Sequence, residues 1–74
     1  MLYMNGADPL YLQLSNQIRH EIESGKLDRG QRLLSERRLA VEYGISRVTA
    51  RMALKCLQDQ GYVLIEPKLG AYVL

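Results

Sequence analysis

The sequence predicts a mainly α-helical fold that ends in a small β-hairpin. Three segments carry apolar residues at helical spacing, and two short runs of strand-forming residues follow them near the C-terminal end. Glycine and N-cap residues separate these segments. The 74 residues allow one domain and leave little chain for an enzyme pocket once a core has formed.

The first helix is expected at about 9–24. Its apolar side chains recur at every fourth position and form one stripe: Leu10, Leu14, Ile18 and Ile22. Asp8 and Pro9 form a helix start, in which Asp8 can accept hydrogen bonds from the free amides of the first turn. Gly25 follows the last turn and suits a left-handed cap.

The chain is expected to divide into a flexible lead-in, 1–8, and one folded domain, 9–74. The lead-in has no apolar period and contains the turn-forming pair Asn5–Gly6. The sequence shows no internal repeat and no low-complexity segment.

Two more helices are expected close together. One spans about 36–43, with Ser35 as its N-cap and Gly44 as its C-cap. The next starts after Ser46 and closes at Gly61, with apolar residues at i, i+3, i+4 and i+7: Ala50, Ala53, Leu54 and Leu57. Two helices joined by a short turn that contains glycine are typical of a helix-turn-helix.

Strand formers fill 62–65 and 71–74, and the loop 66–70 between them has the composition of a hairpin turn. Leu33 and Leu34 could add a very short third strand. Three helices followed by a two- to three-stranded antiparallel sheet indicate a winged helix-turn-helix, in which the hairpin is the wing.

The net charge of +2 conceals an uneven distribution. Residues 26–55 hold eight basic and three acidic residues, a balance of +5, whereas the rest of the chain has a balance of −3. A basic middle with acidic flanks indicates an anionic partner more clearly than the total does.

Basic residues stand at i, i+4 and i+8 on the third helix: Arg47, Arg51 and Lys55. Cations at a helix N-terminus oppose the helix dipole, so a contact role is favoured over a merely solvated face. Arginine there can bond to guanine or to a phosphate, and Val48 can pack on a thymine methyl group. Ser46 and Thr49 can donate to a phosphate or a base edge.

Further cations flank this helix. Arg37 and Arg38 begin the second helix, again at an end where the dipole disfavours them, and are expected to face the phosphate backbone. Lys68 lies at the top of the hairpin, where a DNA contact and a solubility role are equally favoured.

The runs 34–40 (LSERRLA) and 44–54 (GISRVTARMAL), followed by Leu57 and Gly61, resemble the DNA-binding domain of GntR-family bacterial transcription regulators. The start at 9–14 and the end at 70–73 fit as well. The resemblance implies that Arg37, Arg47 and Arg51 contact operator DNA. It also implies that Ser46 and Thr49 lie at the DNA backbone and that the wing enters the minor groove.

The resemblance further implies a repressor that binds palindromic double-stranded operator DNA as a homodimer. A small-molecule effector would act only through a C-terminal domain that this chain lacks, and the start at 9–13 is typical of branches with a HutC-like effector domain. The chain departs from the family pattern at four positions. Arg29 stands where a Pro-Gly pair is usual, and Leu34 stands where proline usually precedes Ser-Glu-Arg. Ala50 is smaller than the usual valine, and Lys68 replaces the first wing glycine.

Other classes of function have weaker support. A winged helix can also serve as a protein–protein interaction module, and this alternative stays open. The single cysteine, Cys56, excludes an intrachain disulfide and a cysteine-based zinc cluster, and His20 has no partner for a metal. With no catalytic motif, signal peptide or apolar membrane span, we expect a cytoplasmic protein that is neither an enzyme nor dependent on a cofactor.

Overall fold

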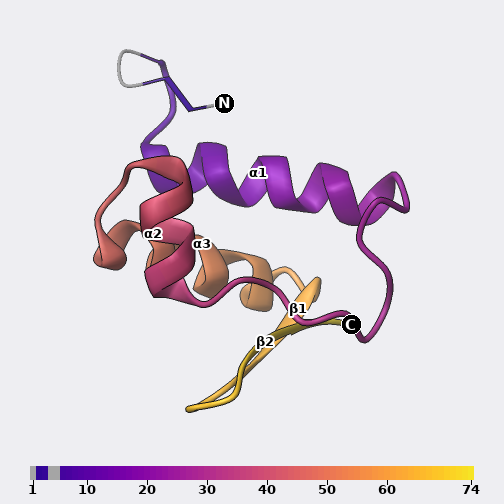
Figure 1. The fold of residues 1–74 in the computed structure, drawn as a ribbon. Coiled ribbons are helices and arrows are strands. Elements are labelled where there is room, and N and C mark those ends of the chain that lie inside the picture. Colours follow the sequence, from indigo (N-terminus) through magenta and orange to yellow (C-terminus); the bar gives the residue numbers. More distant parts are fainter. Residues whose placement is uncertain (1, 4–5) are drawn as a thin grey trace.

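The computed structural model describes residues 2–3 and 6–74 and shows three helices followed by a hairpin (Figure 1). The elements are α1 (Leu10–Glu23), α2 (Glu36–Tyr43), α3 (Arg47–Asp59), β1 (Val63–Glu66) and β2 (Gly70–Val73). In Figure 1, α1 crosses above α2 and α3, and the hairpin projects away from the helices on the opposite side. The winged helix-turn-helix expected from the sequence is confirmed.

The boundaries of α2 and α3 follow from their caps. Ser35 Oγ accepts a hydrogen bond from the backbone N–H of Arg38 at 3.2 Å, and Ser46 Oγ accepts one from the N–H of Thr49 at 3.0 Å. Gly44 ends α2 in the left-handed region, with φ 65°, which glycine adopts without steric cost. The two caps and the glycine keep the turn between the helices short.

The start of α1 differs from the expectation. Pro9 occupies the N-cap position without a side-chain hydrogen bond, so Asp8 does not cap the helix. Instead, Gln13 Nε2 donates to the backbone oxygens of Asp8 and Tyr3, at 2.8 Å each, and Gln13 Oε1 accepts from the N–H of Tyr3 at 2.7 Å. Gln13 therefore ties the described part of the lead-in to α1. The expected turn at Asn5–Gly6 lies partly outside the described residues, and the flexibility of 1–8 stays a prediction.

The core is built around α3, which packs against α1, α2 and β1. Ala50 and Ala53 are completely buried, and such small side chains let neighbouring elements approach the α3 backbone closely. Leu14 and Ile18 of the expected α1 stripe are buried as well, whereas Leu10 and Ile22 at its ends are half-buried. The face of α3 opposite this core is left exposed.

The wing comprises β1, β2 and the loop between them. The strands are antiparallel, with the outermost pairs Val63↔Val73 and Glu66↔Gly70. Val63 and Val73 are buried in the core, so one face of the wing is anchored on the helices. The loop end carries Lys68, whose φ of 69° lies in the left-handed region.

The connector between α1 and α2 runs along the free edge of β2. The short strand expected at Leu33–Leu34 is reduced to one isolated bridge, Arg32↔Tyr72. Beside the bridge, the N–H of Leu33 donates to Ala71 O at 2.7 Å. The N–H of Val73 donates in return to the backbone oxygen of residue 31 at 2.9 Å. The backbone at Leu34 does not pair with the sheet, because the chain turns there into the cap of α2.

Within residues 2–3 and 6–74, no helix is long and apolar enough to cross a bilayer. The same residues contain no cluster of three or more acidic, histidine or cysteine side chains that could hold a metal ion.

Replacing Ala53 with leucine is expected to lower the free energy of unfolding by about 1–3 kcal/mol, because the added atoms meet a filled core. Urea denaturation followed by circular dichroism measures the change. Val41→Ala is the control: Val41 is 73% exposed, so its truncation should change the same quantity by less than about 0.5 kcal/mol. An Ala53→Leu domain as stable as the original would contradict the close packing described for α3.

Candidate nucleic-acid interface

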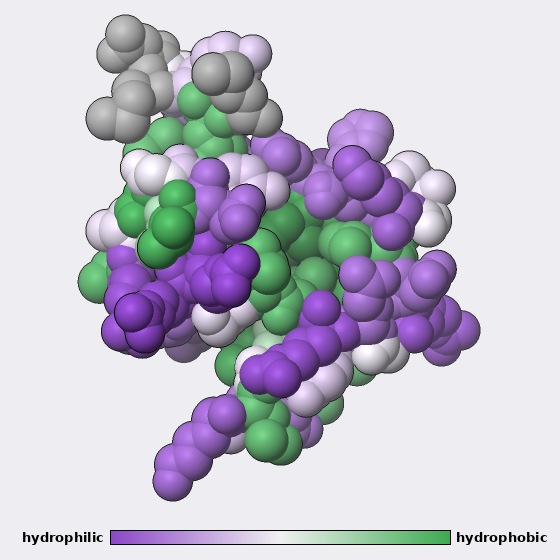
Figure 2. Space-filling view, viewed as in Figure 1, coloured by the Kyte–Doolittle hydropathy of each residue, from purple (hydrophilic) through white to green (hydrophobic). Residues whose placement is uncertain are grey.

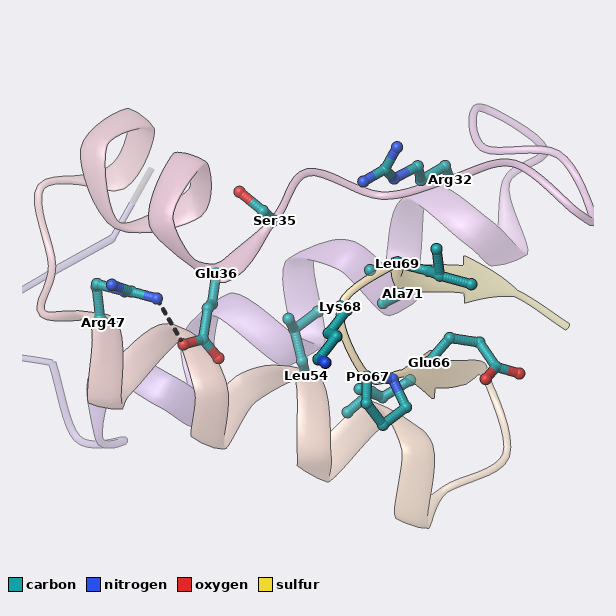
Figure 3. A pocket seen from close by; sticks show the side chains of 12 residues that line it. Arg32, Ser35, Glu36, Arg47, Leu54, Glu66, Pro67, Lys68, Leu69 and Ala71 are labelled. Atoms are coloured by element: carbon teal, nitrogen blue, oxygen red, sulfur yellow. Dashed lines mark hydrogen bonds and ion pairs between the residues drawn. The ribbon is translucent and has the colours of Figure 1, made fainter.

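Glu36, the first residue of α2, joins the two arginines that begin the exposed face of α3. Its Oε1 lies 3.2 Å from Arg47 Nη2 and 3.0 Å from Arg51 Nη2, and its Oε2 accepts a hydrogen bond from Arg51 Nε at 3.2 Å. Figure 3 shows the Arg47–Glu36 contact between the two helices. One carboxylate therefore holds two guanidinium groups side by side, although both arginine side chains remain largely exposed.

The ionisation of these groups is mutually reinforced. The hydrogen bond from Arg51 is the main cause that lowers the pKa of Glu36, and Arg47 adds to it, while partial burial of the carboxylate opposes the shift. The same hydrogen bond raises the pKa of Arg51. At neutral pH the three side chains thus carry a negative and two positive charges, and the cluster keeps a net positive charge.

The first turn of α3 presents small polar and apolar groups beside these arginines. Ser46 Oγ donates to Thr49 Oγ1 at 2.8 Å, and it also accepts the hydrogen bond from the Thr49 N–H that caps the helix. Val48 is 58% exposed, so its methyl groups are open to a partner. The structure therefore gathers Ser46, Arg47, Val48 and Thr49 at one exposed helix end.

The remaining cations of α2 and α3 lie around this cluster rather than within it. Arg37 and Arg38 are exposed at the start of α2, and Arg38 Nη2 lies 3.9 Å from Glu42 Oε1. Lys55 lies two turns beyond Arg47, and a spacing of eight residues rotates it by about 80° around the helix. It lines a separate groove together with Tyr11, so the expectation that it continues the face of Arg47 is only partly met.

A cleft of about 370 Å³ separates the start of α2 and α3 from the wing (Figure 3). Arg47 borders it from α3, Lys68 from the wing and Arg32 from the connector. Figure 2 shows hydrophilic side chains over α2 and at the tip of the wing, with apolar surface between them. Thus the structure brings Lys68 to the same cleft as Arg47, although the two residues are 21 positions apart in the sequence.

Sequence reasoning missed two residues of this surface. Glu36 was counted only among the acidic residues of 26–55, and its two arginine contacts depend on how α2 and α3 are placed relative to each other. Arg32 was counted only in the basic stretch, because its place beside the wing depends on the Arg32↔Tyr72 pairing. A signal for Glu36 was present: an acidic residue at the start of one helix faces a basic helix start only a short turn away.

The fold and the basic cleft define a winged helix-turn-helix domain with the features of a nucleic-acid binder. Residues 10–73 match the family model described as bacterial regulatory proteins, gntR family, and the chain belongs to this family. The resemblance found in the sequence is confirmed, and the family is one of regulators rather than enzymes. The assignment to a HutC-like branch stays a prediction.

Relatives and solved structures agree with this membership. The mannosyl-D-glycerate transport/metabolism system repressor MngR of Escherichia coli (strain K12) is 41% identical over 68 residues, which are 92% of this chain and 28% of that protein. The structure of YtrA from Sulfolobus acidocaldarius, a GntR-family transcription factor, has a TM-score of 0.89 and 30% identity, covering 100% of this chain and 62% of that one.

The DNA-binding domain of AraR in complex with operator ORX1 has a TM-score of 0.90 and 28% identity over 100% of this chain and 95% of that one. The chain spans only about a quarter to a third of the curated relatives that it matches, such as the 28% of MngR.

Replacing Glu36 with glutamine is expected to lower the free energy of unfolding at neutral pH by about 0.2–1 kcal/mol, the usual range for exposed ion pairs. The pKa of Glu36 is lowered from its ordinary value of 4.5, so its contribution is complete above that value and is lost as the pH falls through the lower pKa of the folded state. Denaturation curves of the two proteins should therefore converge in acid.

Glu42→Gln is the matched control, because it removes the same charge from the same helix without touching Arg47 or Arg51. A stability difference for Glu36→Gln that persisted unchanged into strong acid would contradict the ionic nature of the Glu36 contacts.

Proposed function

We propose that the domain binds double-stranded operator DNA in a sequence-specific manner as the DNA-reading part of a bacterial transcription regulator. The observation that carries this proposal is the pair Arg47 and Arg51, which Glu36 holds side by side at the exposed start of α3. Such ordering loses less side-chain entropy on binding than two free arginines would lose. The domain of AraR, which has the same fold, is described in complex with an operator.

In the proposed complex, the start of α3 enters the major groove. Arg47 and Arg51 read base edges, since arginine can bond bidentately to guanine O6 and N7. Val48 contacts a thymine methyl group, which its exposure allows. Ser46 and Thr49 bond to a phosphate of the DNA backbone, and the free amides at the N-terminus of α3 favour the same phosphate.

Other cations complete the proposed contacts. Arg38 at the start of α2 is proposed to bind a phosphate, and its neighbour Arg37 to bind a phosphate or reach a base. Lys68 at the wing tip reaches the minor groove, and Lys55 holds a phosphate farther along α3. Arg38 must exchange its weak contact with Glu42, at 3.9 Å, for the phosphate.

The full-length protein is proposed to act in the cytoplasm as a repressor, in line with the name of MngR. It would form a homodimer that binds palindromic half-sites, because a two-fold symmetric dimer matches a two-fold symmetric DNA site. A small-molecule effector would bind elsewhere in the longer protein. A protein-interaction module is not favoured, because the family model describes regulatory proteins and the similar domain of AraR is described in complex with an operator.

Arg47→Ala and Arg51→Ala are each expected to weaken binding to the operator by about 1–3 kcal/mol, the usual cost of losing a base-reading arginine. Fluorescence anisotropy with a duplex chosen by in-vitro selection measures the affinity, which should also fall steeply with added salt. Lys26→Ala, in the turn after α1 and away from the start of α3, is the charge-matched control. The proposal fails if both arginine variants bind the selected duplex as tightly as the unchanged domain.

Lys68→Gly is expected to separate stability from DNA binding. The left-handed backbone costs a residue with a side chain about 1–2 kcal/mol, and glycine removes this cost at an entropic penalty of about 0.5–1 kcal/mol. The melting temperature should therefore stay the same or rise slightly. Affinity for DNA should fall and the salt slope should decrease by about 0.9, as for one lost phosphate contact. Lys68→Arg should keep the affinity and the salt slope of the unchanged domain. A Lys68→Gly variant that binds DNA as tightly as the unchanged domain would exclude a Lys68 contact.

A further inference from the structure

Arg32 lines the cleft between the start of α3 and the wing. Neither the family motifs nor the contacts proposed above give it a role. It lies on the connector, opposite Lys68 and Arg47 across the cleft (Figure 3). Within the described part of the chain, its guanidinium has no ion pair or hydrogen bond to another side chain, whereas Arg47 and Arg51 share Glu36. The other acidic residue of the cleft, Glu66, is directed away from Arg32 in Figure 3. Arg32 thus offers an uncompensated positive charge to the cleft.

The backbone of Arg32 is fixed to the wing. It forms the bridge with Tyr72, and hydrogen bonds on both sides of the bridge, at 2.7 and 2.9 Å, join the connector to β2. The Arg32 side chain therefore moves with the wing although it belongs to a different segment of the chain.

Gly70 determines where this guanidinium can lie. A Cβ atom at Gly70 would stand 3.0 Å from Arg32 Nε and 3.5 Å from Nη2, so the guanidinium lies against the bare backbone of the wing. The φ of Gly70 is 116°, a conformation that glycine adopts and other residues rarely do. Gly70 thus provides the space in which Arg32 extends over the cleft.

The proposed docking places a DNA strand at this cleft. One sugar-phosphate strand separates a major groove from the neighbouring minor groove. With α3 in the first and the wing tip in the second, that strand must pass between α3 and the wing. The cleft between them is the space available to it, and Arg32 stands at its border.

We propose that Arg32 binds a phosphate of the DNA strand that passes between α3 and the wing, and that Gly70 is the positioning residue for its guanidinium. This inference rests on the proposed DNA binding. The contact is independent of base sequence, because a guanidinium forms charge-assisted hydrogen bonds with any phosphate.

The test measures binding of Arg32→Ala to two duplexes of equal length, one chosen by in-vitro selection and one of scrambled sequence, over a series of salt concentrations. Affinity should fall by about 3- to 10-fold on both duplexes, as for the loss of one ordinary hydrogen-bonded contact at a solvent-exposed site. The salt slope should decrease by about 0.9. Arg29→Ala removes the same charge from the same connector outside the cleft and should leave affinity and slope close to those of the unchanged domain.

Two results would overturn the proposal: an affinity and salt slope equal to those of Arg29→Ala, or a loss confined to the selected duplex, which would mean base reading. Arg47→Ala, measured in parallel, separates a failure of the Arg32 proposal from a failure of the proposed DNA binding. If Arg47→Ala weakens binding to the selected duplex and Arg32→Ala does not, only the Arg32 proposal fails. If the unchanged domain binds neither duplex, both proposals fail.

The role of Gly70 is tested by a double-mutant cycle. Gly70→Ala should weaken binding in the presence of Arg32 and should cost little more in the Arg32→Ala background, because it acts through the guanidinium. Equal losses in both backgrounds would show that Gly70 only shapes the wing. Arg32→Lys, which keeps the charge but not the bidentate geometry, should recover the salt slope and only part of the affinity.

Discussion

The arrangement of the domain depends on the burial of one face of α3. Ala50 and Ala53 have no exposed surface, and the helix packs against α1, α2 and the first strand of the wing. Since α1, α2 and β1 cover this face, the charged residues of α3 lie on the opposite, exposed face. The amphipathic pattern that builds the core therefore also determines which side chains of α3 meet a partner.

Electrostatics adds a second constraint at the start of that exposed side. Two guanidinium groups close together repel each other, and the Glu36 carboxylate between them offsets this repulsion. Glu36 is also in the first turn of α2, where a negative charge suits the helix dipole. One residue thus supports a local helix end and a contact between two helices, which explains how cations can be tolerated at the N-terminus of α3.

The sequence predicted α2 and α3 closely because their boundaries are set locally, by Ser35, Gly44 and Ser46. The errors arose where contacts other than the local cap and strand patterns decide the outcome. Asp8 has the chemistry of an N-cap, but its backbone oxygen is engaged by the Gln13 side chain instead. The apolar pair Leu33–Leu34 indicated a short strand, but no local pattern could place its pairing at Arg32, because the partner is 40 residues away. The basic residues of α3 could be found because they follow helical spacing. The position of Arg32 at the border of the cleft could not be found, because it depends on the pairing with Tyr72.

The bonding of the connector to β2 has a mechanical consequence. The connector leads directly into α2, so the hairpin is attached to the helices at two points: through β1, which follows α3, and through the bridge at Arg32. The wing is therefore held by its buried residues Val63 and Val73 and, in addition, by the backbone hydrogen bonds to the connector, which restrain its position relative to α2 and α3. A restrained wing stands at a set distance from α3. A duplex whose grooves are narrower than this distance requires must be deformed to bind. The domain would thereby respond to the local shape of DNA at base pairs that no side chain touches.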